Sequence, residues 1–157
     1  MRITAKVDYA VRAAIELARA YPDDGSKPVP LTRQAIAEAQ DIPSKFLEHI
    51  LADLKRSQII GSVRGAEGGY WLHRAPELIT MADIIRAAEG PLADVRGERP
   101  DSLDYPEDLA VLQRAWIAVR ANLRAVLERV TLADLRDGHL QPEVDALAVP
   151  DDAWVIH

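Results

Sequence analysis

The stretch that decides the fold is IPSKFLEHILADLKRSQIIGSVRGAEGGYWL, which spans residues 42–72. Its first half predicts a helix from Pro43 to about Ser57, because proline suits a first helical turn. Five apolar side chains recur on one side of that helix and predict a buried stripe: Phe46, Leu47, Ile50, Leu51 and Leu54. The polar side chains lie on the opposite side and are expected to face outward.

A second helix is predicted directly before this one, over residues 33–40. Thr32 is suited to cap it, Ile36 is its inward anchor, and the pair Asp41-Ile42 interrupts it. Two helices joined by so tight a turn, the second with a polar outer face, are typical of a helix-turn-helix.

Two short runs of β-prone residues follow, over residues 59–64 and 70–73, and they flank a glycine-rich turn at residues 65–69. This pattern predicts a β-hairpin. Its glycines permit positive φ angles and let the backbone approach another surface closely. A hairpin placed directly after a helix-turn-helix is typical of a winged helix-turn-helix.

Two further helices are predicted around this core. One covers residues 4–20, and the other covers residues 81–89, where Thr80 is the cap and Gly90 closes the helix. Residues 91–106 are polar and lack periodicity, so they are expected to form a loop.

A long helix is predicted to open at Pro106, Glu107 and Asp108, because proline and acids suit a first turn. Seven apolar residues of this helix alternate in steps of three and four and form a heptad seam: Leu109, Leu112, Trp116, Val119, Leu123, Val126 and Val130. Such a seam is either ordinary core or a dimer contact. Few other helices remain to cover it, which favours dimerisation.

The sequence therefore predicts a mainly α protein with a small β-hairpin: a winged helix-turn-helix with a long C-terminal dimerisation helix. Residues 1–90 are expected to form the winged helix-turn-helix DNA-binding domain, and residues 91–138 a linker loop and the dimerisation helix. Thr131 is suited to cap a short final helix that ends near Gly138. The tail, residues 139–157, is expected either to pack back on the dimer or to stay loose.

Composition narrows the class of protein. Residues 1–74 carry 11 Lys or Arg against 9 Asp or Glu, a net of +2, whereas residues 75–157 carry 8 against 16, a net of −8. A DNA-binding protein tolerates this charge if the acidic half faces away from the phosphates. There is no cysteine, no apolar run near the ~20 residues of a membrane span, and no apolar segment typical of a signal peptide. We expect a cytoplasmic protein.

The outer face of the helix predicted from Pro43 to about Ser57 carries the candidate DNA contacts. Ser44 and Lys45 would lie at its N-terminus, where backbone N–H groups and a hydroxyl can bind phosphate. Glu48 could accept a hydrogen bond from a cytosine amine, and His49 could donate to a purine N7. The alternative is that these side chains form an ordinary solvated helix face.

Two arginines extend this candidate surface. Arg64 stands at the entry to the glycine turn, where it could enter the minor groove or clamp phosphates. Arg33, at the start of the preceding helix, is a further phosphate candidate, although it could equally be a simple helix-end cation.

At residues 42–72 the chain resembles the Rrf2 family of bacterial regulators, and its opening MRITAKVDYAVRAAIELA and the later LITMADIIRAAEG resemble that family's flanking helices. The resemblance extends to about Leu135. It implies a homodimer that binds a palindromic operator in double-stranded DNA. It also implies DNA contacts from Ser44, Lys45 and Glu48 and, in the wing, from Arg64, Gly65, Gly68 and Gly69. The family wing usually reads Arg-Gly-Pro-Gly-Gly-Gly-Tyr, whereas Ala66 and Glu67 replace a proline and a glycine here.

The chain departs from the family in its chemistry. Sensing members hold an iron–sulfur cluster with three cysteines in the segment that corresponds to residues 91–106, and this chain has none. The histidines lack metal-ligand spacing, and Asp8 is interpreted as an exposed or capping acid. We therefore expect neither a cofactor nor a metal.

Three functional hypotheses follow from these observations. The first is a repressor, and the second is a regulator whose DNA binding depends on a partner protein docked on the acidic C-terminal half. An enzyme is disfavoured, because no nucleophile–base pair, phosphate loop or metal motif is present. A small-molecule or protein effector is possible in this family, and a pocket near Trp116 and Tyr105 is one place for it.

Overall fold

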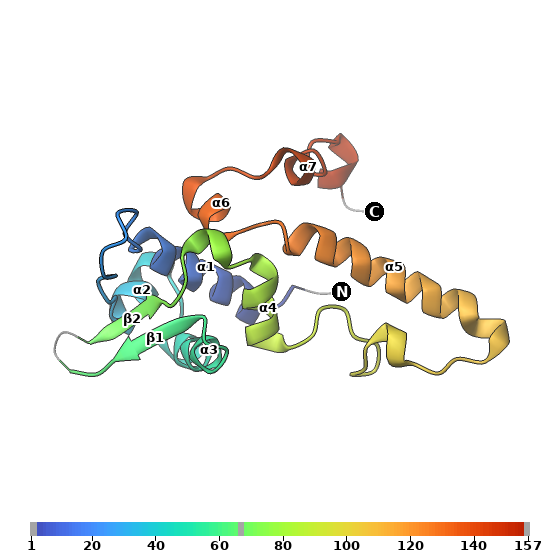
Figure 1. Ribbon diagram of the computed structural model, residues 1–157, viewed down its shortest axis with the longest axis horizontal. Helices are drawn as coiled ribbons and strands as arrows, with labels where there is room; N and C mark the ends of the chain where they lie inside the picture. The colour runs from blue at the N-terminus through green and yellow to red at the C-terminus, as the bar shows by residue number, and fades with distance from the viewer. Residues whose placement is uncertain (1–2, 66–67, 156–157) are drawn as a thin grey trace.

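The computed structural model describes residues 3–65 and 68–155 (Figure 1), so the wing-tip residues Ala66 and Glu67 lie outside the described residues. The predicted class is confirmed: the fold is mainly helical with one two-stranded antiparallel hairpin. The elements are α1 (Ala5–Arg19), α2 (Arg33–Gln40), α3 (Ser44–Arg56), β1 (Ile60–Val63), β2 (Gly69–Leu72), α4 (Met81–Glu89), α5 (Ala110–Leu127), α6 (Leu132–Asp137) and α7 (Pro142–Asp145), with short 3-10 helices η1 (Pro76–Leu78), η2 (Pro100–Ser102), η3 (Glu107–Leu109) and η4 (Asp151–Trp154).

Helix α1 is the centre of the core. The Thr4 hydroxyl caps it by accepting a hydrogen bond from the Val7 N–H at 3.2 Å. Its inner face buries Leu17 among several alanines, whose small side chains let α2, α3, α4 and α6 all pack against the same helix. The core therefore surrounds α1 rather than lying on one side of it.

The helix-turn-helix forms as predicted. Thr32 caps α2, and Asp41 ends it in the left-handed conformation with φ of 49°. In α3, Leu47, Ile50, Leu51 and Leu54 are buried. Phe46 was predicted to share that stripe, but this was wrong: it is 50% exposed and meets the Tyr9 ring edge-on, with ring centroids 5.9 Å apart.

The hairpin also forms, with Ile60 opposite Leu72 and Val63 opposite Gly69. The sequence did not indicate that it has a third partner: Leu31 pairs with Tyr70 through two backbone hydrogen bonds of 2.9 and 2.8 Å. This bridge ties the segment before α2 to the wing, so the wing and the helix-turn-helix are one packed unit.

Helix α5 projects away from this unit (Figure 1). It starts at Ala110, after the turn η3, and so begins later than predicted. The predicted seam divides into two parts. Leu112, Trp116 and Val119 are 39%, 38% and 46% exposed, whereas Val130 is buried against the core. The exposed part is an apolar face that the described part of this chain leaves uncovered.

After α5 the chain returns to the core. Thr131 caps α6 in a capping box with Asp134, as its position predicted, and Leu132 is fully buried. The backbone of Thr131 pairs with Thr80 beside α4. Helix α6 is not the final helix that was expected, because α7 and η4 follow in the tail. None of the described helices is long and apolar enough to span a bilayer.

Replacement of a core leucine of α3 tests this packing. We expect Leu54→Ala, at a fully buried position, to lower the free energy of unfolding by about 2–5 kcal/mol through lost burial and a residual cavity. Leu78→Ala is the matched control, because Leu78 is 64% exposed and its loss should cost within about 0.5 kcal/mol. Urea titration followed by circular dichroism measures both. Equal losses would contradict the assigned core.

Candidate nucleic-acid interface

The polar face of α3 points into solvent. Ser44, Lys45, Glu48 and His49 are all exposed, and the buried leucines lie on the opposite side of the helix. In Figure 1, α3 and the hairpin lie along the same lower side of the molecule. Helix α3 therefore presents a polar ridge, and the wing extends beside it.

The first turn of α3 leaves its backbone donors open. Pro43 is the N-cap and the helix has no side-chain cap, while the first bond of the helical pattern runs from the Leu47 N–H to the Pro43 carbonyl. The earlier N–H groups of the helix point outward at its positive end, beside the Ser44 hydroxyl and the Lys45 ammonium. This arrangement can bind an anion such as a phosphate.

Arg33 and Glu48 form an ion pair that joins α2 to the outer face of α3. The Arg33 Nη1 lies 3.3 Å from the Glu48 Oε2, and both side chains are largely exposed. Two residues that the sequence suggested separately are thus brought together. The pair is accessible to water, so its own contribution to stability is small. Its geometry places the arginine beside the middle of the polar ridge.

The wing supplies the second group of candidates. Arg64 and Gly65 are exposed directly after β1, and Gly65 has a φ of +116° that few other residues adopt. A Cβ on Gly68 would lie 2.7 Å from the Val63 and Gly65 carbonyl oxygens, and one on Gly69 would lie 2.5 Å from the Leu31 carbonyl oxygen. Gly69 is buried, so its lack of a side chain serves the close packing of the hairpin on Leu31.

Asp53 holds α3 in place, and the sequence analysis missed it. Its carboxylate lies 2.8 Å from the Lys6 Nζ of α1 and 2.9 Å from the Arg56 Nη1. The hydrogen bond from Lys6, with help from the charge of Arg56, holds the pKa of Asp53 below its ordinary value. At the end of α3, the Lys55 Nζ donates to the Ser62 Oγ at 2.7 Å and joins the helix to β1. The Lys6–Asp53 pair joins two helices that are distant in sequence, so it leaves no periodic signal.

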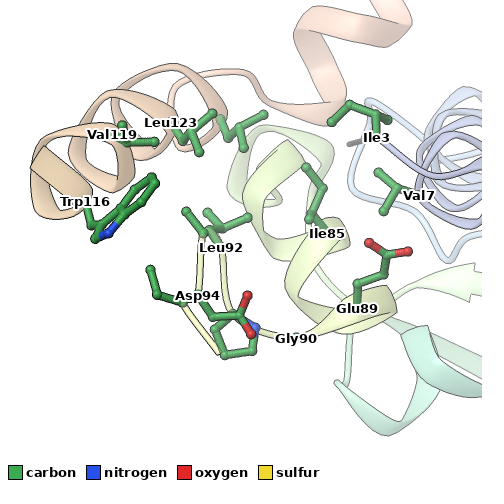
Figure 2. Close-up of a pocket in the computed structure, with 14 residues that line it drawn as sticks. Ile3, Val7, Ile85, Glu89, Gly90, Leu92, Asp94, Trp116, Val119 and Leu123 are labelled. Atoms are coloured by element: carbon green, nitrogen blue, oxygen red, sulfur yellow. The ribbon is translucent and has the colours of Figure 1, made fainter. Parts of the chain in front are cut away.

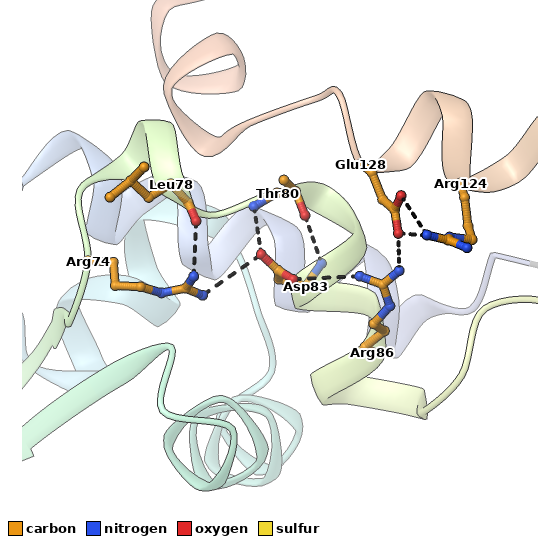
Figure 3. A network of polar contacts seen from close by, with 7 residues as sticks. All are labelled: Arg74, Leu78, Thr80, Asp83, Arg86, Arg124 and Glu128. Carbon is orange, nitrogen blue, oxygen red and sulfur yellow. Dashed lines mark hydrogen bonds and ion pairs between the residues drawn. The ribbon is translucent and has the colours of Figure 1, made fainter.

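A chain of ion pairs runs from the wing to α5 (Figure 3). Arg74, just after β2, lies 3.8 Å from Asp83 of α4, and Asp83 lies 3.6 Å from Arg86. Arg86 in turn pairs with Glu128 at the end of α5, which also accepts a 2.9 Å hydrogen bond from Arg124. Arg124 and then Arg86 lower the pKa of Glu128. The chain of charges spans the contact between the DNA-binding unit and α5.

These features can be compared with known proteins. Residues 3–138 match the profile of a family described as "Rrf2: Iron-dependent Transcriptional regulator". The chain belongs to the Rrf2 family. It is therefore a DNA-binding transcription regulator and not an enzyme, and the predicted resemblance is confirmed.

Relatives of this Rrf2 protein cover nearly its whole length. A Mycobacterium tuberculosis protein classed as an HTH-type transcriptional regulator is 42% identical over 94% of this chain and 89% of its own. The structure of Bacillus subtilis CymR, titled the global cysteine regulator, superposes with a TM-score of 0.67 at 31% identity and covers 88% of this chain and 98% of its own. The structure of T. potens IscR gives 0.67 and 31%, with coverage of 99% and 97%.

The family description names iron, and the residues of this Rrf2 chain do not suit an iron–sulfur cluster. Such clusters need soft thiolate ligands, and the chain has no cysteine. Among the described residues, no group of three His, Asp or Glu side chains is placed to hold a metal ion. His49 in α3, His73 after β2 and His139 after α6 are exposed in separate parts of the chain, and His157 lies outside the described residues.

The Asp53 contact predicts a pH dependence of stability. Because the pKa of Asp53 is lowered in the folded state, its contribution is present above the unfolded pKa of about 3.9 and is lost as the pH falls through the lower folded value. We expect Asp53→Asn to be less stable by about 1 kcal/mol at pH 7 and to lose less stability than the wild type between pH 5 and pH 2. Denaturant titrations at several pH values measure this. Asp104→Asn, an exposed change, is the control, and identical pH profiles for Asp53→Asn and the wild type would refute the assignment.

Proposed function

We propose that this protein is a homodimeric repressor that binds a palindromic operator in double-stranded DNA. The observation that carries the proposal is the polar ridge of α3, backed by buried leucines and placed beside the hairpin. A B-DNA major groove accepts one such helix and offers its base edges to the helix's outer side chains.

The proposed contacts divide by role. Ser44, Lys45 and Arg33 bind phosphates, helped by the open N–H groups of the first turn of α3, and these contacts fix the register on the duplex. Glu48 and His49 read base edges. Because Arg33 pairs with Glu48, the arginine also restrains the carboxylate as it enters the groove. The base preference then depends on both residues.

The wing is proposed to grip the backbone beside the recognition helix. Arg64 contacts phosphates or the minor groove, and Gly65 and Gly68 let the turn approach the duplex closely. Gly69, buried against Leu31, would act by holding the hairpin in position. This grip is independent of base sequence.

The dimer is proposed to form through the exposed seam of α5. Leu112, Trp116 and Val119 make an apolar face at heptad spacing on a helix that projects from the core, and a second copy would bury it. A two-fold dimer would present two α3 helices to one face of the duplex, and its matching operator would be palindromic. Repression follows when the bound dimer occupies a promoter.

Two arginine variants test the proposed contact between the wing and the DNA backbone. A duplex obtained by selection from a random pool serves as operator, and fluorescence anisotropy measures the affinity. We expect Arg64→Ala to weaken binding to all duplexes, by about tenfold, with a shallower salt dependence, because it removes a phosphate contact. Arg129→Ala, which removes an exposed arginine directly after α5, should leave the affinity unchanged. If both variants bind alike, the wing contact is wrong.

Glu48→Ala tests the reading of bases. We expect a changed preference at one position of each half-site, with discrimination there reduced by about 1–3 kcal/mol. The change should leave binding to random duplexes nearly intact.

Purified wild-type protein that binds no duplex alone, but binds once a partner is added, would instead support the partner-dependent regulator. In vitro transcription from a promoter with the operator should fall as protein is added; a rise would contradict repression.

Leu112→Asp tests the dimer. A carboxylate buried in the seam lacks a partner, so we expect a monomer at micromolar concentration and at least a tenfold loss of operator affinity. Val149→Asp is the control, since Val149 is a 70% exposed residue of the tail. Sedimentation velocity measures both. A Leu112→Asp protein that stays dimeric would refute the α5 interface.

A further inference from the structure

The turn at residues 90–92 lines two hollows near the contact between α4 and α5. Figure 2 shows the first, an apolar pocket of about 470 Å³ whose walls include Trp116 and Val119 of the α5 seam. The second copy in the proposed dimer would cover those residues, so this pocket would not be free to bind a ligand. The second hollow is an open groove of about 370 Å³. None of the seven seam residues, all of which the structure describes, contributes to its lining.

This arginine groove is lined by four arginines from three parts of the chain: Arg86 of α4, Arg99 of the loop before α5, and Arg120 and Arg124 of α5. Residues 90–92 complete the lining, and no aspartate or glutamate of the described chain contributes to it. The two arginines of α5 are four residues apart, so they lie on the same face of the helix. All the lining residues and their neighbours in sequence lie within residues 68–155, which the structure describes.

Asp101 pairs with two of these arginines at once. It lies 2.7 Å from the Arg99 Nη2 and 2.9 Å from the Arg120 Nη1. The hydrogen bond from Arg99 lowers the pKa of Asp101, so this carboxylate is ionised at neutral pH. The Arg120 Nε is buried and has no hydrogen-bond partner among the described residues, which is an unfavourable state for a donor. The charge of Arg120 is therefore only partly compensated.

Glu128 is shared in the same way. Both Arg86 and Arg124 pair with it (Figure 3). Arg86 also lies 3.6 Å from Asp83, but Asp83 divides its charge with Arg74, which lies 3.8 Å away. The four guanidinium groups of the groove thus meet two shared carboxylates and part of a third. The remaining excess of positive charge favours an anionic ligand.

We propose that the arginine groove binds a small molecule that carries a phosphate group. A guanidinium presents paired N–H donors in a plane, and this arrangement matches the oxygens of a phosphate. A phosphate monoester carries close to two negative charges in neutral solution, so it would offset the charge that Asp101 and Glu128 leave uncompensated. Pro91 and Leu92 offer an apolar surface to the rest of the molecule.

The position of the groove suggests what such a ligand does. An anion that competes with Glu128 for Arg86 and Arg124 would change how α5 is fixed to α4. Because α5 carries the proposed dimer seam, this change would alter the spacing of the two α3 helices and thereby the operator affinity. Only this regulatory consequence rests on the proposed function, since ligand binding itself is measured without DNA.

Isothermal titration calorimetry at pH 8 with three probes of matched shape tests the site. The probes are the dianion phenyl phosphate, the monoanion benzenesulfonate and the neutral benzenesulfonamide. We expect phenyl phosphate to bind about fivefold more tightly than benzenesulfonate, and the neutral probe to bind most weakly, because the charge of the ligand decides the strength of its pairs with arginine. Absence of phenyl phosphate binding, or a sulfonate or sulfonamide that binds as tightly, would overturn the proposal.

A double variant locates the site. Arg99→Gln with Arg124→Gln changes two largely exposed side chains and should weaken phenyl phosphate binding by about tenfold. Arg114→Gln, which changes an exposed arginine of α5 outside the lining, is the matched control and should leave binding unchanged. Circular dichroism verifies that all variants fold. Unchanged binding in the double variant would refute the proposal.

Lys45→Gln separates the groove from the proposed DNA contacts. We expect this variant to bind phenyl phosphate as the wild type does, and a loss of binding would move the phosphate to α3 and overturn the proposal. If the double arginine variant loses duplex affinity and the wild type binds no phenyl phosphate, the arginines serve DNA instead and the proposal is wrong. Phenyl phosphate binding without any operator binding would refute the proposed function and leave this site intact.

Discussion

The structure depends on the burial of one apolar stripe of α3 against α1. Leu47, Ile50, Leu51 and Leu54 are almost fully enclosed, and at about 1.5–3 kcal/mol for each such side chain this burial fixes the rotation of the helix about its axis. Once that rotation is fixed, the polar residues can only face outward. The Asp53 contact with Lys6 adds a directional restraint at the edge of the same interface.

The hairpin and α5 extend this core in different ways. The wing is fastened by backbone pairing between Leu31 and Tyr70, which needs Gly69 for its close approach. Helix α5 is fastened to the core at its end, where Val130 is buried and Arg86 pairs with Glu128. Its outer part is held by the preceding loop, through the Arg120–Asp101 ion pair and the hydrogen bonds that Gln113 donates to the Pro100 and Leu103 carbonyls. These contacts leave the apolar face of Leu112, Trp116 and Val119 exposed, which is where a second copy would stabilise the helix.

Local patterns predicted much of this fold. The N-caps Thr32, Thr80 and Thr131 could be predicted from the sequence, because a threonine hydroxyl caps a helix by accepting a hydrogen bond from a backbone N–H only three residues later. The exposure of Phe46, the Leu31 bridge and the Arg33–Glu48 pair depend on where distant segments meet, and periodicity carries no such information. The candidate contacts on α3 and Arg64 were named from the sequence, whereas the arginine groove needed the three-dimensional arrangement of α4, α5 and the loop between them.

The central claim is that the outer side of α3 enters the major groove. Methylation interference on a selected operator tests it most directly, because guanine N7 lies in the major groove and adenine N3 in the minor groove. The account predicts strong N7 interference in two clusters on one face of the duplex, a whole number of helical turns apart, with each turn about 10 base pairs. Interference confined to adenine N3, or none at guanine N7, would contradict it.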